Sequence, residues 1–146
     1  MEHKNGVDEA EIRELIKNRV DAVSIKDVKK AMASVESNVL LFDVVNPLQS
    51  SGLETLRKRA EQWFSSFDGP IGFETRDLNI VTGDDVAFSH SLNRVKARTI
   101  NGQKLEMWWR STVCYRRMDG KWMVTHEHNS VPFDPGTGKA SLDLQP

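Results

Sequence analysis

The sequence lacks several features that whole classes of protein require. It has one cysteine, Cys114, which excludes an internal disulfide and a metal site built from several cysteines. Twenty basic and 21 acidic residues leave a net charge of −1, so there is no broad positive field for nucleic acid or an anionic membrane. No run is long and apolar enough for a membrane span, and residues 1–6 are too polar for a signal peptide. We therefore expect a cytoplasmic protein with neither a nucleic-acid partner nor a membrane partner.

What the chain does contain is typical of one globular domain. Of its 146 residues, 38% are hydrophobic and 28% are charged. A chain of this length buries roughly two-thirds of the surface that it exposes when unfolded, which is enough for one hydrophobic core.

Two helices are predicted near the N-terminus. Apolar residues recur at helical spacing from Ile12 to Val23, after Asp8 and Glu11, which have the spacing of a capping box. Asp27 can cap a short second helix, whose buried side would include Ala31.

A third helix is predicted between a strand and a turn. Residues 39–45 are apolar and rich in β-branched side chains, which predicts a strand that ends at Asn46-Pro47. Ser51 and Glu54 repeat the capping-box spacing, and the helix that they start should end before Asp68-Gly69-Pro70. Its apolar stripe is the bulkiest of the three and comprises Leu53, Leu56, Ala60, Trp63, Phe64 and Phe67.

Beyond Ile71 the pattern changes to strands. Turn signals at residues 82–85, 101–102 and 119–120 separate four long strands in a meander. Residues 133–146 have no periodicity and contain three glycine or proline breakers within 135–138, so we expect an irregular tail after a domain over residues 1–132. The predicted fold class is α+β, with three helices on a curved, mainly antiparallel sheet.

The lengths of two hairpin loops decide which side chains share a face. Asn101-Gly102 favours a two-residue loop, which pairs Ile100 with Gln103. For residues 118–120 we expect a three-residue loop, which pairs Arg117 with Lys121. A loop one residue shorter would exchange the two faces of the last strand.

With this register one face is apolar at one end and polar at the other, and we expect it to lie under the helices with its polar cluster lining a cavity. It carries Phe88, His90, Leu92, Leu105, Met107, Trp109, Ser111, Val113, Tyr115, Met123, Thr125, Glu127 and Asn129. The opposite face holds Trp108, Trp122 and Val124, and burial of these three predicts a homodimer through the sheet.

Three segments carry a resemblance to a known family. They are Arg110-Ser111-Thr112, the Tyr-Arg-Arg-Met-Asp-Gly-Lys-Trp run at 115–122, and the His-Glu-His-Asn-Ser-Val-Pro run at 126–132. With the order of helices and strands, they resemble the SnoaL-like and ketosteroid-isomerase-like group of the nuclear transport factor superfamily over residues 8–132. The last hairpin is also similar to the association (hub) domain of calcium/calmodulin-dependent protein kinase.

The resemblance implies a cone-shaped fold with a central pocket and a dimeric assembly. The superfamily includes isomerases, cyclases, dehydratases and non-catalytic members, so it implies no single reaction. Ketosteroid isomerases use an Asp base with a Tyr and a protonated Asp as oxyanion donors. Here Asp43 is near the position expected for the base, the first helix has no tyrosine, and Glu127 is the candidate from the sheet.

The candidate catalytic residues are Glu127, Asp43 and His90. A carboxylate in an apolar cavity has its pKa moved toward neutrality, which suits Glu127 or Asp43 as a general base. His90 would move a proton or orient a ligand, while Asn129 and Ser111 would donate to a developing oxyanion. Structural hydrogen bonding is the alternative role for each of these residues.

A ligand would be hydrophobic or aromatic, with Trp63, Trp109 and Tyr115 as walls of its pocket. His126 and His128 alternate on one side of the last strand, together with Arg110, and would form the site if the loop at 118–120 were shorter. Because no carboxylate shares their face, we predict no metal, and we expect no cofactor.

Two functions are open at this point. One is a cofactor-independent isomerase, cyclase or dehydratase that uses a pocket carboxylate. The other is a non-catalytic ligand-binding or oligomerisation module like the kinase hub.

Overall fold

The structure, a computed structural model, describes residues 2–146, and their side chains from residue 6 onward. Its elements are α1 (Glu2–Ser24), α2 (Val28–Ala31), β1 (Val35–Phe42), β2 (Ser50–Ser51), α3 (Leu53–Ser65), β3 (Phe67–Thr82), β4 (Val86–Thr99), β5 (Lys104–Met118), β6 (Lys121–Ser130), β7 (Phe133–Asp134) and β8 (Lys139–Ala140).

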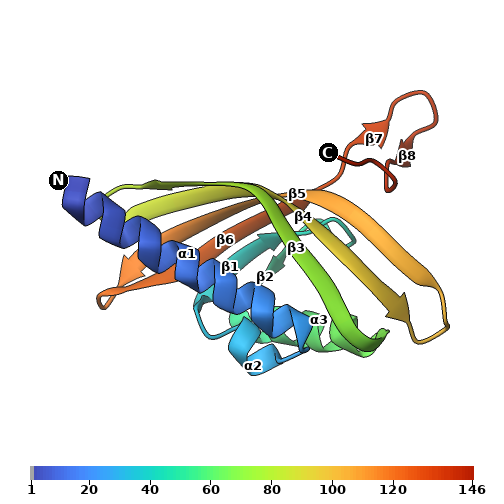
Figure 1. Ribbon diagram of the computed structural model, residues 1–146, viewed down its shortest axis with the longest axis horizontal. Coiled ribbons are helices and arrows are strands. Elements are labelled where there is room, and N and C mark those ends of the chain that lie inside the picture. Colours follow the sequence, from blue (N-terminus) through green and yellow to red (C-terminus); the bar gives the residue numbers. More distant parts are fainter. Residues whose placement is uncertain (1) are drawn as a thin grey trace.

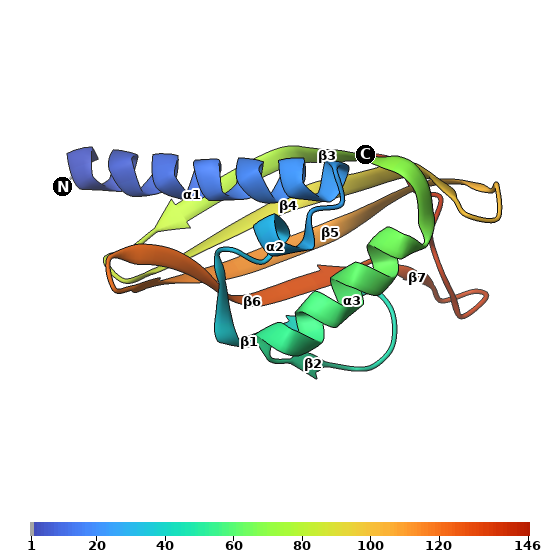
Figure 2. The same cartoon turned by 90° about the horizontal axis from the view of Figure 1, so that it is seen from below.

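Six strands form one curved sheet in the order β2-β1-β6-β5-β4-β3. All neighbouring pairs are antiparallel except β1 and β6, which run parallel. The three helices lie on one side of this sheet, with α1 across β3 and β4 and with α3 beside β1 and β2 (Figures 1 and 2). The α+β class, the three helices and the four-stranded meander are confirmed. None of the helices in residues 2–146 combines the length and hydrophobicity that a membrane span needs.

The core lies between the helices and the inner face of the sheet, and it has two parts. One surrounds Tyr115 and joins α1 to β1, β5 and β6; it contains Ile12, Leu15, Val35, Val39, Leu41, Leu56, Ala87, Val113, Tyr115, Trp122 and Val124. The other joins the C-terminal ends of α1 and α3 to β3 and β4, and it contains Ala22, Ala31, Phe64, Phe67, Ile71 and Val95. The apolar stripes of the sequence thus form the contact between the two layers.

Only one of the three predicted helix caps is confirmed. The Asp27 side chain accepts a hydrogen bond from the Lys30 amide at 3.0 Å, as an N-cap does. The other two are wrong, since Asp8 lies inside α1 and the N-cap of α3 is Gly52, at φ +91° and without a side-chain cap. Asp8 is buried instead, and Arg117 of β5 contacts its Oδ1 at 2.7 Å.

Two segments that read as irregular form strands. Asp68-Gly69-Pro70 lies inside β3, where the pairing with β4 shifts between Asp68 and Gly72. This segment therefore makes an irregularity within a strand rather than a loop. Beyond residue 132, β7 and β8 pair as a short hairpin that extends away from the large sheet (Figure 1). The lack of periodicity in the tail did not predict this pairing.

Candidate functional site

The hairpin between β4 and β5 differs from the prediction by one residue. Arg98 pairs with Lys104, and the Thr99 amide donates to the Gln103 carbonyl at 2.8 Å around a three-residue loop. Gly102 takes the left-handed conformation at φ +81° that this loop needs. The predicted faces of β4 are therefore wrong: Ser89, Ser91, Asn93 and Val95 point to the helices, whereas Phe88, His90 and Leu92 lie on the outer face.

The hairpin between β5 and β6 also differs from the predicted register by one residue, but a bulge further along β6 compensates for the difference. Met118 pairs with Lys121 around the two-residue loop Asp119-Gly120, both at positive φ, so the predicted three-residue loop is wrong. A bulge follows, because Tyr115 pairs with Val124 while Cys114 pairs with His126, leaving Thr125 as the extra residue.

Together, the shorter loop and the bulge restore the predicted orientation of the side chains that follow Thr125 in β6. Glu127 pairs with Val113 and Asn129 pairs with Ser111, on the inner face. Before the bulge, Trp122 and Val124 also point inward and are 4% and 1% exposed, so their predicted place on the dimer face is wrong. Met123 lies outside, opposite Arg116.

The inner face carries a band of polar side chains across three strands. Ser91, Ser111 and Asn129 are register neighbours on β4, β5 and β6. Ser89 and Glu127 flank Val113 in the next row toward Tyr115. Because an apolar core surrounds this band, its polar groups need partners within it or a ligand.

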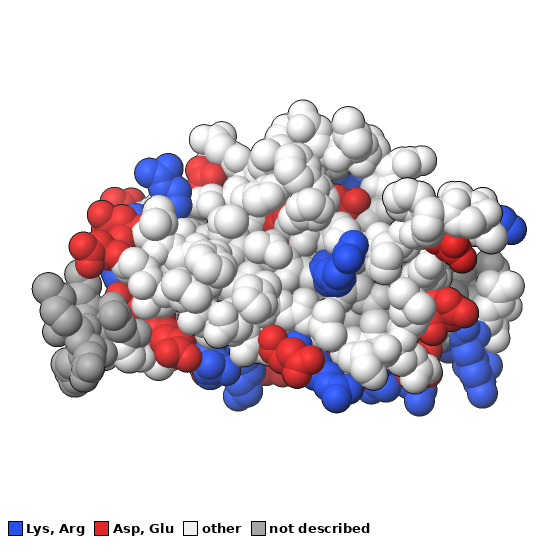
Figure 3. Space-filling model, turned by 90° about the horizontal axis from the view of Figure 1, so that it is seen from above, with Lys and Arg blue, Asp and Glu red and all other residues white. Residues whose placement is uncertain are grey.

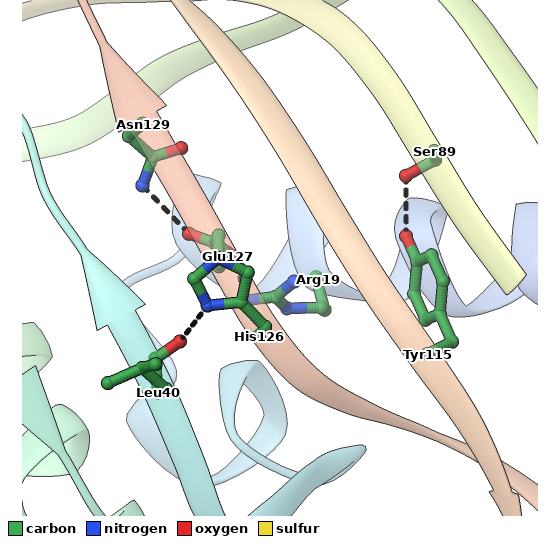
Figure 4. Close-up of polar contacts among 7 residues, drawn as sticks. All are labelled: Arg19, Leu40, Ser89, Tyr115, His126, Glu127 and Asn129. Carbon is green, nitrogen blue, oxygen red and sulfur yellow. Dashed lines mark hydrogen bonds and ion pairs between the residues drawn. The ribbon is translucent and has the colours of Figure 1, made fainter. Parts of the chain in front are cut away.

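At the centre of the band, Arg19 of α1 forms an ion pair with Glu127. Arg19 Nη2 lies 2.9 Å from Glu127 Oε1, and Asn129 Nδ2 donates to Glu127 Oε2 at 2.9 Å (Figure 4). The side chains of Arg19 and Glu127 remain 22% and 19% exposed. We call Arg19, Glu127 and Asn129 the central cluster; it reaches from the helix layer to the sheet and retains contact with solvent.

The charges in the central cluster stabilise each other. Burial would raise the pKa of Glu127, but the charge of Arg19, with hydrogen bonds from Asn129 and Arg19, brings that pKa below its ordinary value. The pKa of Arg19 is raised by Glu127 despite burial. The expected shift of the Glu127 pKa toward neutrality is therefore wrong, because Arg19, 108 residues earlier in the chain, supplies a positive charge beside the carboxylate. Since an ionised carboxylate can only accept, the amide nitrogen of Asn129 must face it.

Tyr115 supplies a neutral hydroxyl beside the central cluster. Its Oη and Ser89 Oγ lie 2.8 Å apart (Figure 4). Burial raises the pKa of Tyr115 to about 12, and the Ser89 hydrogen bond and the Arg19 charge only partly oppose that rise. The phenol therefore stays protonated at neutral pH.

This shift can be measured directly, because Tyr115 is the only tyrosine. In a spectrophotometric titration, the native protein should show no phenolate at pH 10 and ionise near pH 12, whereas the urea-unfolded chain ionises near pH 10. Since the folded pKa lies above the unfolded one, this group contributes stability below pH 10 that is lost as the pH rises to about 12. Native ionisation near pH 10 would mean that the hydroxyl is solvated.

The second predicted base, Asp43, is also paired with an arginine. Arg59 Nη2 of α3 lies 2.7 Å from Asp43 Oδ2, and the Val44 amide donates to Asp43 Oδ1 at 2.8 Å. Asp43 directly follows β1, which runs parallel to β6 with Leu41 opposite Glu127. Each candidate base therefore sits at a contact between a helix and one of the two parallel strands.

The three candidate histidines, His90, His126 and His128, lie on the outer face of the sheet. His90 is exposed on the outer face, with its Nε2 3.3 Å from Asn79 Nδ2, so the register that placed it in the cavity is wrong. His126 Nδ1 contacts the Leu40 carbonyl at 2.8 Å, and the edge-on ring of Phe42 lies beside both His126 and His128. In Figure 4, His126 and Arg19 lie on opposite sides of β6. Among the described residues, no three His, Cys, Asp or Glu are grouped to hold a metal.

The remaining candidates divide between the two faces. Trp63 packs edge-on against Phe67 with ring centroids 5.3 Å apart, and Trp109 packs edge-on against Phe73 at 5.5 Å. Both tryptophans are partly buried against the second core cluster, on the helix side of the sheet. Arg110 is exposed on the outer face, where its Nε donates to Ser130 Oγ at 3.2 Å.

Arg19 and Arg59 were not predicted as site residues, yet the sequence holds a signal for both. Arg19 lies three residues after Ile16 and four after Leu15, within the apolar stripe of α1. Arg59 lies three residues after Leu56 in α3. A charged residue at a buried helical position requires a partner, which indicates a functional or structural ion pair.

Two surface depressions lie elsewhere. Both are open and adjoin Glu61 and Ser65 of α3; one extends to Ile100 and the other to Lys26 and Val28. Neither is lined by a residue of the central cluster.

Comparison with known proteins assigns this arrangement to a family. Residues 12–134 match the SnoaL-like domain. The chain belongs to the SnoaL-like family. Among solved structures, a protein from Pseudomonas putida described as NTF2-like and of unknown function is 35% identical with a TM-score of 0.88, over 97% of this chain and 98% of that one. No curated protein matches the chain.

Two more distant structures share the fold of this SnoaL-like chain. A ketosteroid isomerase-like protein from Erwinia carotovora is 17% identical with a TM-score of 0.71, over 83% of this chain and 93% of that one. The association domain of CaMKII from C. elegans is 15% identical with a TM-score of 0.67, over 88% of this chain and 98% of that one. The predicted superfamily is confirmed.

Proposed function

We propose that this protein binds a small molecule between the helices and the sheet, with the polar group of the ligand on the central cluster. The observation that carries the proposal is the Arg19–Glu127 ion pair, which lies over the inner face of the sheet and yet keeps about a fifth of each side chain exposed. Ion pairs inside a core contribute little to stability, because desolvation offsets their attraction. Charged groups in such a place are therefore candidates for function.

The apolar part of the ligand would lie beside the central cluster. Trp109 occupies the inner face of β5, two residues from Ser111 and six from Tyr115, and it is only partly buried. Its indole offers a wall for a flat or aromatic molecule. Ser111 is 5% exposed and lies next to Asn129 in the sheet, at the boundary between this wall and the polar band.

We favour binding over acid–base catalysis by Glu127. A general base works best with a pKa near the working pH, whereas Arg19 and Asn129 hold the pKa of Glu127 below its ordinary value. The same contacts fix the carboxylate in one orientation and suit it to accept hydrogen bonds from a ligand. The isomerase, cyclase and dehydratase activities therefore remain the second reading, through Glu127 or Asp43.

The test is a thermal-shift screen with alcohols, amides, ketones and carboxylates on benzene, naphthalene and cyclohexane rings. At least one class should raise the melting temperature of the wild type, and Arg19→Met should lose that shift because the recognition group is gone. Glu54→Gln, which alters an exposed ion pair with Arg57, is the matched control and should keep it.

Two results would overturn parts of this proposal: the first its ligand site, and the second its preference for binding over catalysis. One is the absence of any shift across the panel, which would leave the central cluster a structural ion pair. The other is catalysis: exchange of ketone α-protons with D2O by the wild type, lost in Glu127→Gln, would establish Glu127 as a base.

We also propose that two copies associate through the outer face of the sheet. Seen from the side opposite the helices, this face is a broad surface with charged side chains mainly at its rim (Figure 3). Phe88 is 42% exposed there, and Leu92, Trp108 and Met123 are partly exposed on the same face. Such a surface is apolar enough to bury against a second copy.

A further inference from the structure

The charges on the inner face cancel in pairs. Arg19 is paired with Glu127, and Arg59 with Asp43. The other polar side chains of the band, Ser89, Ser91, Ser111 and Asn129, are uncharged, and so are their inner-face neighbours Asn93 and Tyr115, the latter as a protonated phenol. No net charge is therefore left among these described groups for an ionic ligand to neutralise.

From this balance we infer that the ligand presents a neutral hydrogen-bonding group to the central cluster, such as a hydroxyl, an amide or a ketone, and not a carboxylate or a phosphate. The inference rests on the proposed function, and it names the class of ligand that the site accepts.

Competition for Arg19 is the physical reason. An anionic ligand would have to share the guanidinium with Glu127 Oε1, which already lies 2.9 Å from Arg19 Nη2. Two carboxylates would then stand close together in a partly desolvated site, where like charges repel more strongly than in water. A neutral group avoids this repulsion and loses less hydration when it binds.

A neutral ligand can use the donors and acceptors that the ion pair leaves over. Among the described contacts, Arg19 donates only through Nη2 to Glu127, and a guanidinium has five N–H donors. Each carboxylate oxygen of Glu127 accepts one hydrogen bond, from Arg19 or from Asn129, and has room for a second. A hydroxyl or amide could therefore donate to Glu127 and accept from Arg19 at once.

Glu127→Gln gives this inference a sharp test. Glutamine has nearly the same shape, and its one carbonyl oxygen can still accept from Arg19 while its NH2 group donates to the amide oxygen of a turned Asn129, but it no longer neutralises the guanidinium. The variant site would carry one positive charge. Its preference should then move from neutral ligands toward carboxylates.

The experiment measures affinities by calorimetry at pH 7 for matched probes: 2-naphthylmethanol and 2-naphthamide against 2-naphthoate. The wild type should bind the neutral probes at least about tenfold more tightly than the carboxylate. In Glu127→Gln this ratio should fall by about tenfold or reverse. Glu54→Gln removes a carboxylate from an exposed ion pair and should leave the ratio unchanged.

The outcomes separate this inference from the proposed function. If the wild type binds 2-naphthoate as tightly as the neutral probes, the ligand class is wrong while the binding site stands. An unchanged ratio in a folded Glu127→Gln also overturns the inference, since the probe would not contact the cluster. If Glu127→Gln does not fold, the affinities of the wild type for the neutral and anionic probes decide the inference by themselves. If no probe binds the wild type and the wider panel gives no shift, the proposed function itself fails.

Discussion

Arg19→Met is expected to lower the free energy of unfolding at pH 7 by about 3 kcal/mol, because it leaves Glu127 charged and without its cation in the core. The expected loss is at the low end for a broken buried pair, since both side chains keep about a fifth of their surface exposed. Methionine fills much of the volume of the arginine stem, so the change tests the charge more than the packing. Urea unfolding followed by tryptophan fluorescence gives the measurement.

The pH dependence of the Arg19→Met effect distinguishes a charge effect from a packing effect. In the wild type the folded pKa of Glu127 is lowered, so its contribution is present above the unfolded pKa of about 4.3 and is lost as pH falls through the folded pKa. In the variant the charge and the hydrogen bond of Arg19 are gone and burial is opposed mainly by the Asn129 hydrogen bond, so the folded pKa of Glu127 rises relative to the wild type and the ionised carboxylate contributes less stability at pH 7. The gap between the two proteins should therefore narrow as the solution is acidified.

Two further variants complete this test. Arg19→Met combined with Glu127→Gln should recover most of the loss at pH 7, because no buried charge remains. Arg57→Met breaks an exposed pair with Glu54 and should cost less than about 1 kcal/mol. A loss in Arg19→Met that is the same at all pH values, or no greater than in Arg57→Met, would contradict the role of Arg19 as the partner that keeps Glu127 ionised.

The architecture could be predicted from the sequence because it depends on local patterns. Helical periodicity located α1 and α3, and alternation with turn signals located the meander. Asp27 was predicted correctly as a cap because a cap bonds to its own helix within three residues. Asp8 was not, because its partner Arg117 is 109 residues away and only the folded sheet brings it close.

The orientation of the site depended on irregularities that turn rules do not include. A three-residue loop formed at residues 100–102, where the Thr99 hydroxyl accepts from the Gln103 amide at 3.1 Å and supports the wider turn. The bulge at Thr125 forms where β6 must pair with β5 on one side and with parallel β1 on the other. Because β1 lies far before β6 in the chain, with Leu40 and His126 86 residues apart, no local pattern predicts that constraint.

The partners of the predicted carboxylates were missed for a related reason. Glu127 and Asp43 were selected as carboxylates on apolar strands, which is a local property. Arg19 and Arg59 come from helices, and only the packing of the two layers brings each arginine to its carboxylate. Once Arg19 is known, the expected net shift of the Glu127 pKa changes from upward to downward, although burial still acts to raise it. A charged residue within an apolar helical stripe, such as Arg19 or Arg59, is the sequence pattern that indicates a buried partner of opposite charge.

Trp108→Glu is expected to convert the proposed dimer to a monomer at micromolar concentration. Trp108 lies on the outer face of β5, where the Arg94 guanidinium is 5.7 Å from its ring centre. A glutamate there would place one carboxylate per copy in an apolar interface, and this desolvation should raise the dissociation constant by about a thousandfold or more. Sedimentation equilibrium measures the change in mass.

The fold of Trp108→Glu should survive, which makes the loss of association interpretable. The side chain is already partly exposed, and a glutamate at 108 can approach Arg94, whose guanidinium also pairs with Glu74 and Glu106 at the same surface. Ile100→Glu is the matched control, since Ile100 is 66% exposed at the tip of the β4–β5 hairpin, and it should remain a dimer. A wild type that sediments as a monomer would refute association through this face. A Trp108→Glu variant that stays dimeric would place the contact on another surface of the protein.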